Sequence, residues 1–254
     1  MAIAKQTVSG NPVGLILLAC LVSAFLMTVN DFPPLTFIFV MLGWILAVGV
    51  HEFGHAWVAW LGGDHTVRDK GYLTLDPRKY ADLQTTLIWP LIALALGGIG
   101  FPGGAVWLRE DLMRGPLWRS AASLAGPAGS FLVLLVLVLV LALLPVSAES
   151  ETLAAAVAFL AFLQATAVVL NLLPVPGFDG FGVLRPFLPA GVRSAAARIE
   201  PVAPLIALAV LLLVPGASSV IFGLALSLAQ AVGLSPPQVF QGLEDFRFWT
   251  RLGA

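Results

Sequence analysis

Long apolar runs with almost no charged residues, separated by short polar stretches, dominate the chain. They cover residues 13–29, 35–61, 83–108, 120–148, 153–173 and 201–243. A helix needs about 20 apolar residues to cross the hydrocarbon core of a bilayer, and most of the runs meet that length. Because backbone groups in lipid must be satisfied within the protein, the pattern predicts an all-α, polytopic helical membrane protein. We expect about five to six membrane segments, packed into one compact domain.

Two of these runs are interrupted by residues that break helices. The run 83–108 contains several prolines and glycines, which favour a re-entrant or interfacial segment over a regular span. The run 201–243 is broken at Pro215 and Gly216, so it forms either one long kinked span or a helical hairpin. The sequence leaves both alternatives open.

The domain boundary follows from where the apolar runs end. We expect residues 1–233 to form the membrane domain, with a core at 35–185. Residues 234–254 are expected to form an interfacial tail, because their apolar side chains recur at helical spacing beside arginines.

Composition agrees with a membrane protein and excludes other classes. Hydrophobic residues make up 59% of the 254 residues and charged residues 11%, with a mean hydropathy of +0.97. A soluble domain carries about 25% charged residues. The net charge of −1 gives no indication of a nucleic-acid partner, and the single cysteine, Cys20, has no internal disulfide partner.

The run 35–61 contains only three ionisable residues, and they form the sequence H-E-x-x-H. His51 and His55 are four residues apart, so a helix places both imidazoles on one face, where they can bind one zinc ion. Glu52 lies beside them, where it can act on a metal-bound water. Ionisable groups within a span are costly and need partners, so this cluster is the candidate reactive centre.

A catalytic zinc site usually has three protein ligands and one open position. No third ligand follows H-E-x-x-H at the spacings of the soluble metalloproteases. The best remaining acid is Asp179, which follows the run 153–173 in a segment rich in proline and glycine. Taken alone, Asp179 before Gly180 also fits a simple turn aspartate, and that interpretation stays open at this point.

The two motifs together resemble the site-2 protease family of intramembrane zinc metalloproteases. H-E-F-G-H at 51–55 is followed by N-L-L-P-V-P-G-F-D-G at 171–180, which matches that family's N-x-x-P-x-x-x-x-D-G pattern at every defined position. The pair Gly126 and Ser130 and the loop from Gly63 to Pro77 are also similar to the family, although we interpret the pair as helix packing. The chain departs from many members because no stretch is long and polar enough for a PDZ or CBS domain. It also lacks the lysine that compact relatives often carry near residues 101–106.

The resemblance implies the roles of individual residues. His51, His55 and Asp179 would ligate one Zn²⁺ per chain, Glu52 would be the general acid and base, and Asn171 would bind the substrate backbone or the oxyanion. The implied activity is hydrolysis of peptide bonds within or near transmembrane segments of other membrane proteins in the lipid bilayer. The oligomeric state stays undetermined.

A shared metal site restricts the topology. Both halves of the site lie near the C-terminal ends of their helices, so these helices must run in the same direction, and only one of 83–108 and 120–148 can cross fully. If 120–148 crosses, every lysine and arginine except Arg247 and Arg251 lies on one side of the membrane. The alternative divides them almost evenly. The positive-inside rule therefore places the active site toward the cytoplasm, in a multi-pass protein of the plasma (inner) membrane.

Two other function classes compete with a protease. A polytopic metal-ion transporter also holds histidine and aspartate in its membrane core, but it more often spreads ligands over several helices and duplicated halves. A catalytically inactive protease-like membrane scaffold is the second alternative, although the intact Glu52 argues against it.

Purified protein should contain about one zinc ion per chain. His51→Ala or His55→Ala should remove the zinc and the activity together, because each change deletes one ligand. Elemental analysis of the purified variants measures this directly. Full zinc occupancy in the double variant would contradict the assignment.

Overall fold

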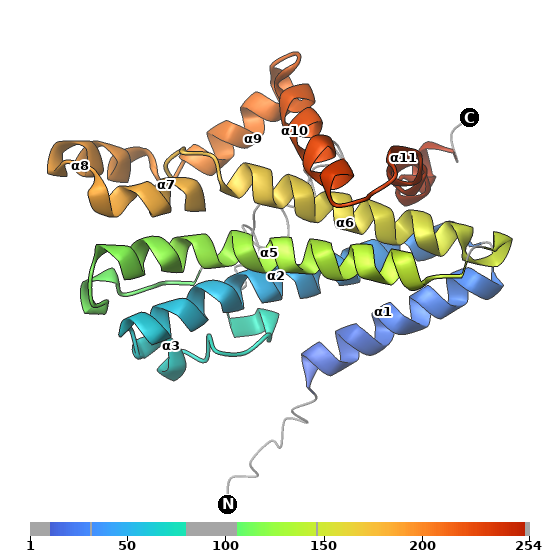
Figure 1. Ribbon diagram of the computed structural model, residues 1–254, viewed down its shortest axis with the longest axis horizontal. Helices are drawn as coiled ribbons and strands as arrows, with labels where there is room; N and C mark the ends of the chain where they lie inside the picture. Colours follow the sequence, from blue (N-terminus) through green and yellow to red (C-terminus); the bar gives the residue numbers. More distant parts are fainter. Residues whose placement is uncertain (1–10, 31, 80–105, 146, 252–254) are drawn as a thin grey trace, which may run out of the picture.

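The computed structural model describes residues 11–30, 32–79, 106–145 and 147–251, and the regular elements among them are all helical (Figure 1). Among these described residues, four helical segments are long and apolar enough to cross a membrane, or five if the bent pair α8 and α9 forms one span. They are α1 (Pro12–Val29), α2 (Pro34–Gly62), α5 (Pro116–Leu143) and α6 (Glu151–Asn171) with the 3-10 turn η4 (Ala148–Ser150) that precedes it. The shorter elements are α3 (Thr66–Asp69), η1 (Pro77–Lys79), η3 (Glu110–Leu112), α7 (Asp179–Leu184), η5 (Arg185–Phe187), α8 (Ala190–Ile199), α9 (Ala203–Leu213), α10 (Ala217–Ala231), α11 (Pro236–Phe246) and η6 (Phe248–Thr250). The predicted fold class is confirmed.

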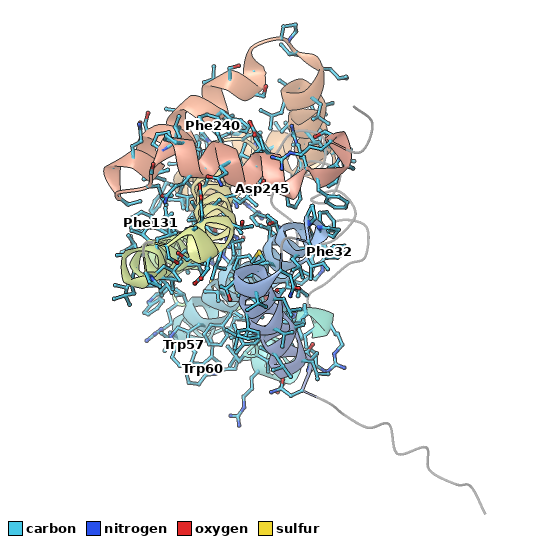
Figure 2. All side chains as sticks on the ribbon, turned by 90° about the vertical axis from the view of Figure 1, so that its right-hand side faces the viewer. Phe32, Trp57, Trp60, Phe131, Phe240 and Asp245 are labelled. Atoms are coloured by element: carbon cyan, nitrogen blue, oxygen red, sulfur yellow. The ribbon has the colours of Figure 1, made fainter. Side chains whose placement is uncertain are left out.

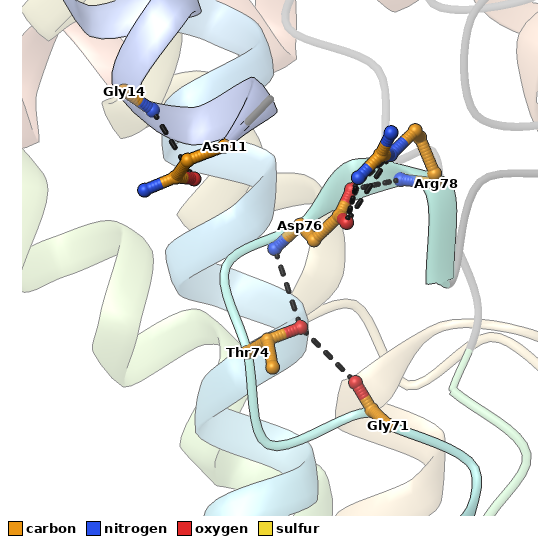
Figure 3. Close-up of polar contacts among 6 residues, drawn as sticks. All are labelled: Asn11, Gly14, Gly71, Thr74, Asp76 and Arg78. Atoms are coloured by element: carbon orange, nitrogen blue, oxygen red, sulfur yellow. Dashed lines mark hydrogen bonds and ion pairs between the residues drawn. The ribbon is translucent and has the colours of Figure 1, made fainter. Parts of the chain in front are cut away.

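Prolines and short polar side chains set the ends of the helices. The Asn11 side chain accepts a hydrogen bond from the Gly14 N–H and caps α1 (Figure 3). α5 begins at Pro116, before the predicted run 120–148, and ends at Leu143. Both predicted ends of that run are wrong. The helix starts in the polar region before the apolar run, and Pro145 disfavours helical backbone at the residue that precedes it.

Hydrogen bonds and an ion pair hold the polar loop after α3 in place (Figure 3). The Thr74 hydroxyl donates to the Gly71 carbonyl at 3.0 Å and accepts from the Asp76 N–H at 3.4 Å. Asp76 pairs with Arg78 at 2.7 Å, and the hydrogen bonds from Arg78 lower the pKa of the Asp76 carboxyl. The loop therefore has its own local support outside the membrane spans.

The helices α2, α5 and α6 pack together as the core. α2 and α6 run in the same direction, and α5 runs in the opposite direction (Figure 1). The Arg114 N–H donates to the Gly62 carbonyl at 2.9 Å, so the chain after α2 returns to the same end of the bundle before α5 begins. Within the described part of the chain, α5 is the one crossing helix between α2 and α6, as the topological argument required. The expectation of a re-entrant or interfacial segment at 83–108 falls mostly on residues 80–105, outside the described residues.

α6 occupies the centre of the molecule. In the most apolar stretch of the α6 span, 83% of the residues are buried, whereas in that of α1 17% are buried. α6 packs against α2, α5, α10 and α11, and its Phe159, Phe162 and Leu163 side chains are fully buried. α1 instead exposes large apolar side chains such as Leu18 and Phe25, which suit a lipid environment.

The last apolar run folds as a helical hairpin. α9 and α10 have 11 and 15 residues and are separated by a turn in which Gly216 has a φ of +82°. Each is shorter than the ~20 residues of a full span, and α8 and α9 meet at a 63° bend. The alternative of one long kinked span is therefore not what the structure shows.

α11 lies across the bundle over the N-terminal half of α6 (Figure 2). A Cβ at Gly242 would lie 2.1 Å from the Ala155 carbonyl oxygen, so only glycine allows this contact. Phe246 is fully buried, with its ring 5.3 Å from that of Phe159. The apolar face of the described part of the tail, residues 234–251, thus packs on the membrane domain. Its interfacial position and the domain boundary stay predictions.

Gly54→Ala should destabilise the protein by about 1–3 kcal/mol, the usual cost of overpacking. The added Cβ would lie 2.6 Å from the Ala125 carbonyl oxygen, which is backbone and cannot rotate away. Thermal unfolding in detergent, followed by circular dichroism, measures the effect. Gly223→Ala in α10 is the control, because its Cβ meets no described atom within 4 Å and alanine favours helix. An equal melting temperature for the two variants would contradict the packing argument.

Candidate metal centre

His51 and His55 point from α2 toward the same point between the helices. Both side chains are buried, and their Nε2 atoms lie 3.1 Å apart. The ring planes are tilted by 80°, so the two nitrogens converge without stacking. The helical spacing of the motif therefore produces the paired imidazoles that the sequence predicted.

Asp179 reaches the same point from the first turn of α7. Its Oδ2 lies 3.2 Å from His51 Nε2, and its Oδ1 lies 3.3 Å from His55 Nε2. The following residue makes this approach possible. A Cβ at Gly180 would lie 2.2 Å from the Leu172 carbonyl oxygen, so α7 can rest on the end of α6 only with glycine there.

The three side chains could hold a zinc ion. The two Nε2 atoms are 3.1 Å apart, and each lies 3.2–3.3 Å from one of the two Asp179 carboxylate oxygens. Ligands on a tetrahedral zinc with bonds of about 2.0–2.1 Å lie about 3.3–3.4 Å apart, so these separations suit a shared zinc ion. Two nitrogens and one carboxylate oxygen are also a usual donor set for a catalytic zinc.

Electrostatics supports a cation at this point. The Asp179 carboxylate lies 3.2–3.3 Å from the two imidazole nitrogens. Its Oδ2 is buried and forms no hydrogen bond with another described residue. Acceptor atoms that converge without a shared proton repel one another, and a bound cation removes that repulsion.

Helix α5 orients both imidazoles through their other nitrogens. His55 Nδ1 donates to the Ala122 carbonyl at 2.7 Å, and His51 Nδ1 lies 3.0 Å from the Ser130 hydroxyl. A carbonyl can only accept, so the proton of His55 sits on Nδ1 and the lone pair of Nε2 faces the metal position. The prediction treated Ser130 as a packing residue only. Ser130 is the last polar side chain before the continuous apolar stretch 131–144, and that position was the available signal for this contact.

Gly126 forms the floor of the site. A Cβ there would lie 2.2 Å from His55 Nε2 and 2.6 Å from His51 Nε2. One turn along α5, a Cβ at Gly129 would lie 3.0 Å from the Val50 carbonyl. The small residues of α5 therefore serve the site itself as well as the contact between the helices.

Glu52 is buried beside the two histidines, with 3% of its surface exposed. Its Oε2 accepts a hydrogen bond from the Val106 N–H at 3.1 Å. The segment that begins at Val106 is held at its other end by Asp64, whose Oδ2 accepts from the Arg109 N–H at 2.7 Å. Asp64 is fully buried and also binds Thr66, so it anchors this segment along α2. Sequence reasoning missed both contacts.

Asn171 is the last residue of α6 and is 4% exposed. It does not belong to the metal-binding group, and its side chain forms no hydrogen bond with another described residue. Its placement leaves the amide available. Its role in binding substrate stays a prediction.

Fold and site define the class: a polytopic membrane protein with a His-His-Asp group and a buried glutamate inside its helical bundle. The chain is 40% identical to the Mycolicibacterium smegmatis protein named "Putative zinc metalloprotease Rip2", over 97% of this chain and 96% of the relative. It is 43% identical to the Mycobacterium tuberculosis protein of that name, over 84% of this chain and 82% of the relative. It is also 28% identical to "Putative zinc metalloprotease YwhC" of Bacillus subtilis, over 64% of this chain and 74% of the relative.

The chain belongs to the site-2 protease family of zinc metalloproteases, as its two motifs indicated. No protein-family model matches the chain, and no solved structure matches it with significance.

Gly126→Ala should abolish zinc binding, because its Cβ would occupy the space beside both Nε2 atoms. Zinc content and helicity of the purified variant measure this. Gly129→Ala is the matched control, since it also presses on α2 but meets backbone instead of the imidazoles. Normal zinc content in Gly126→Ala, or an equal loss in Gly129→Ala, would contradict the role of Gly126 as the floor of the metal site.

Proposed function

We propose that the protein is a zinc metalloprotease that hydrolyses peptide bonds within or near transmembrane segments of other membrane proteins. Membership of the site-2 protease family supports zinc as the cofactor and proteolysis as the activity. The site lies among helices that are long and apolar enough to cross a membrane, which supports membrane proteins as substrates.

One observation carries this proposal. The two Nε2 atoms and the Asp179 carboxylate lie within 3.3 Å of one another, directly beside the buried Glu52. A hydrolytic zinc site has three protein ligands and, beside them, a carboxylate that is not itself a ligand, which is the place of Glu52 here. His51, His55 and Asp179 would hold the ion, and one coordination position would stay open.

Zinc, when bound, polarises the substrate carbonyl and lowers the pKa of a coordinated water. Glu52 takes the proton from the attacking water, whose oxygen forms the new bond to the carbonyl carbon. The C–N bond then breaks, and Glu52 returns the proton to the leaving amine. The Val106 N–H engages Oε2 of Glu52, which leaves Oε1 for the proton.

Asn171 would bind the substrate backbone or the oxyanion. Its position at the end of α6, with a side-chain amide that forms no hydrogen bond with another described residue, supports this role. A helical substrate must first unwind, because intrahelical hydrogen bonds occupy its carbonyl groups. The Asn171 amide, at the end of α6, can donate one of the hydrogen bonds that the substrate carbonyls lose when the segment unwinds.

We place the protein in the inner membrane with the active site toward the cytoplasm. α2 and α6 finish at the end of the bundle where the basic residues of α3, α5 and α8 lie (Figure 1). Arg247 and Arg251 follow α11, near the other end. An excess of lysine and arginine marks the cytoplasmic side of membrane proteins.

The transporter and the inactive scaffold are not favoured. Within the described residues, one group alone has the composition and spacing of a metal site, and two short segments supply it. A transporter needs a pathway with further ligands. A scaffold has no need of the buried glutamate beside the group.

Glu52→Gln should retain zinc and lower the cleavage rate by about 10²–10⁴-fold, since it removes the base but no ligand. Asp179→Ala should lose both zinc and cleavage. The assay is co-expression with a panel of tagged single-span proteins, combined with zinc analysis of the purified variants.

Glu151→Gln is the matched control, because it removes a carboxylate from the opposite end of α6. Its cleavage rate and zinc content should equal those of the wild type. Near wild-type cleavage by Glu52→Gln would show that the proposed mechanism is wrong.

A further inference from the structure

A pocket of about 340 Å³ lies at the end of the bundle where α5 and α8 begin. Its polar lining residues are Glu110 of η3, Arg119 of α5, Arg185 of η5, and Arg193 and Ser194 of α8. None of these residues belongs to the metal group. Its volume is at the lower end of the range for pockets that bind small ligands, about 300–1,000 Å³.

The pocket has more positive charge than the protein neutralises. Arg185 is paired, with Glu110 at 3.6 Å and Glu200 at 3.3 Å. Arg119 and Arg193 form no ion pair with another described residue. The nearby Asp111 does not supply one, because Arg109 holds it at 2.7 Å.

Arg119 also carries an unsatisfied donor. Its Nε is buried and has no hydrogen-bond partner in the described part of the chain. A buried donor without a partner is unfavourable, and a bound acceptor would remove that cost. The guanidinium planes of Arg119 and Arg193 suit an anion with several oxygens, since each can offer two parallel N–H groups.

Helix α8 adds backbone donors. It is 10 residues long, begins at Ala190 on the pocket wall, and has no side chain that caps its first turn. Its first N–H groups and its dipole favour a negative group at this end. The unpaired guanidinium groups and the N–H groups of α8 therefore suit a phosphate group.

The surroundings indicate which molecule carries the phosphate. Three large apolar side chains beside the pocket are about half exposed: Leu184 at 46%, Phe187 at 58% and Val192 at 48%. Such side chains next to arginines suit the boundary between headgroups and acyl chains of a membrane. We propose that this pocket binds the phosphate headgroup of an anionic phospholipid, whose acyl chains lie along these apolar side chains.

A bound headgroup would connect three elements around α7. α7 starts at Asp179 and packs on α5, where the Ser120 hydroxyl donates to the Val183 carbonyl at 2.8 Å. Arg119 precedes this contact, and Arg185 and Arg193 follow α7. The lipid would thus hold the element that begins at Asp179 in place and stabilise the folded protein by mass action.

The test uses the purified full chain in detergent and measures binding of phosphatidylglycerol and of phosphatidylcholine by native mass spectrometry. Wild type should bind phosphatidylglycerol in preference. Arg119→Gln and Arg193→Gln should each weaken that binding about tenfold, the usual effect of losing one charge-assisted hydrogen bond. Arg198→Gln is the matched control, because it removes the same charge from α8 outside the pocket.

Helicity and zinc content show that each variant is folded. Phosphatidylglycerol binding that is unchanged in both pocket variants would overturn the proposal, as would equal loss in Arg198→Gln. A third arm adds inorganic phosphate. If phosphate alone binds as tightly as the lipid and displaces it, the ligand is a soluble anion and the lipid assignment is wrong.

Discussion

The candidate metal centre depends on how closely the backbone of α5 approaches α2. In lipid, no hydrophobic force drives helices together, so their contact rests on packing between small residues. Gly54 on α2 and Gly126 and Gly129 on α5 leave room for that contact. The same approach brings a carbonyl and a hydroxyl of α5 within hydrogen-bond reach of both imidazoles. The glycines that let α2 and α5 pack closely are therefore also needed to orient the two imidazoles.

The second requirement is that α2 and α6 run in the same direction. α2 carries His51 and His55 in its C-terminal half, and α6 ends shortly before Asp179. A parallel pair brings those ends together. α6 is buried on most sides, so its end is a firm support for the turn that carries Asp179. The exposed α1 has no comparable part in the site. Burial is thus greatest along the helix that supports the carboxylate ligand.

The sequence predicted much of this because the controlling signals are local. Apolar runs located α1, α2, α5 and α6, and the need for a third ligand together with the basic residues gave the topology. The ends of α5 were missed because hydropathy measures the apolar stretch, whereas proline at 116 and 145 sets the helix. The contact of Ser130 with His51 and that of Asp64 with Arg109 join residues far apart in the chain. No local pattern encodes such contacts, so only the fold reveals them.

The bond between Glu52 and Val106 has a consequence for how this protein can vary. The donor is a main-chain N–H, so the side chain at position 106 is irrelevant to it. Every amino acid except proline supplies the same group. Comparison of residue identities among relatives would therefore pass over this position, although it touches the acid that the chemistry needs. The position of this N–H depends instead on the Asp64 side chain, 42 positions earlier, which binds the same segment at the Arg109 N–H.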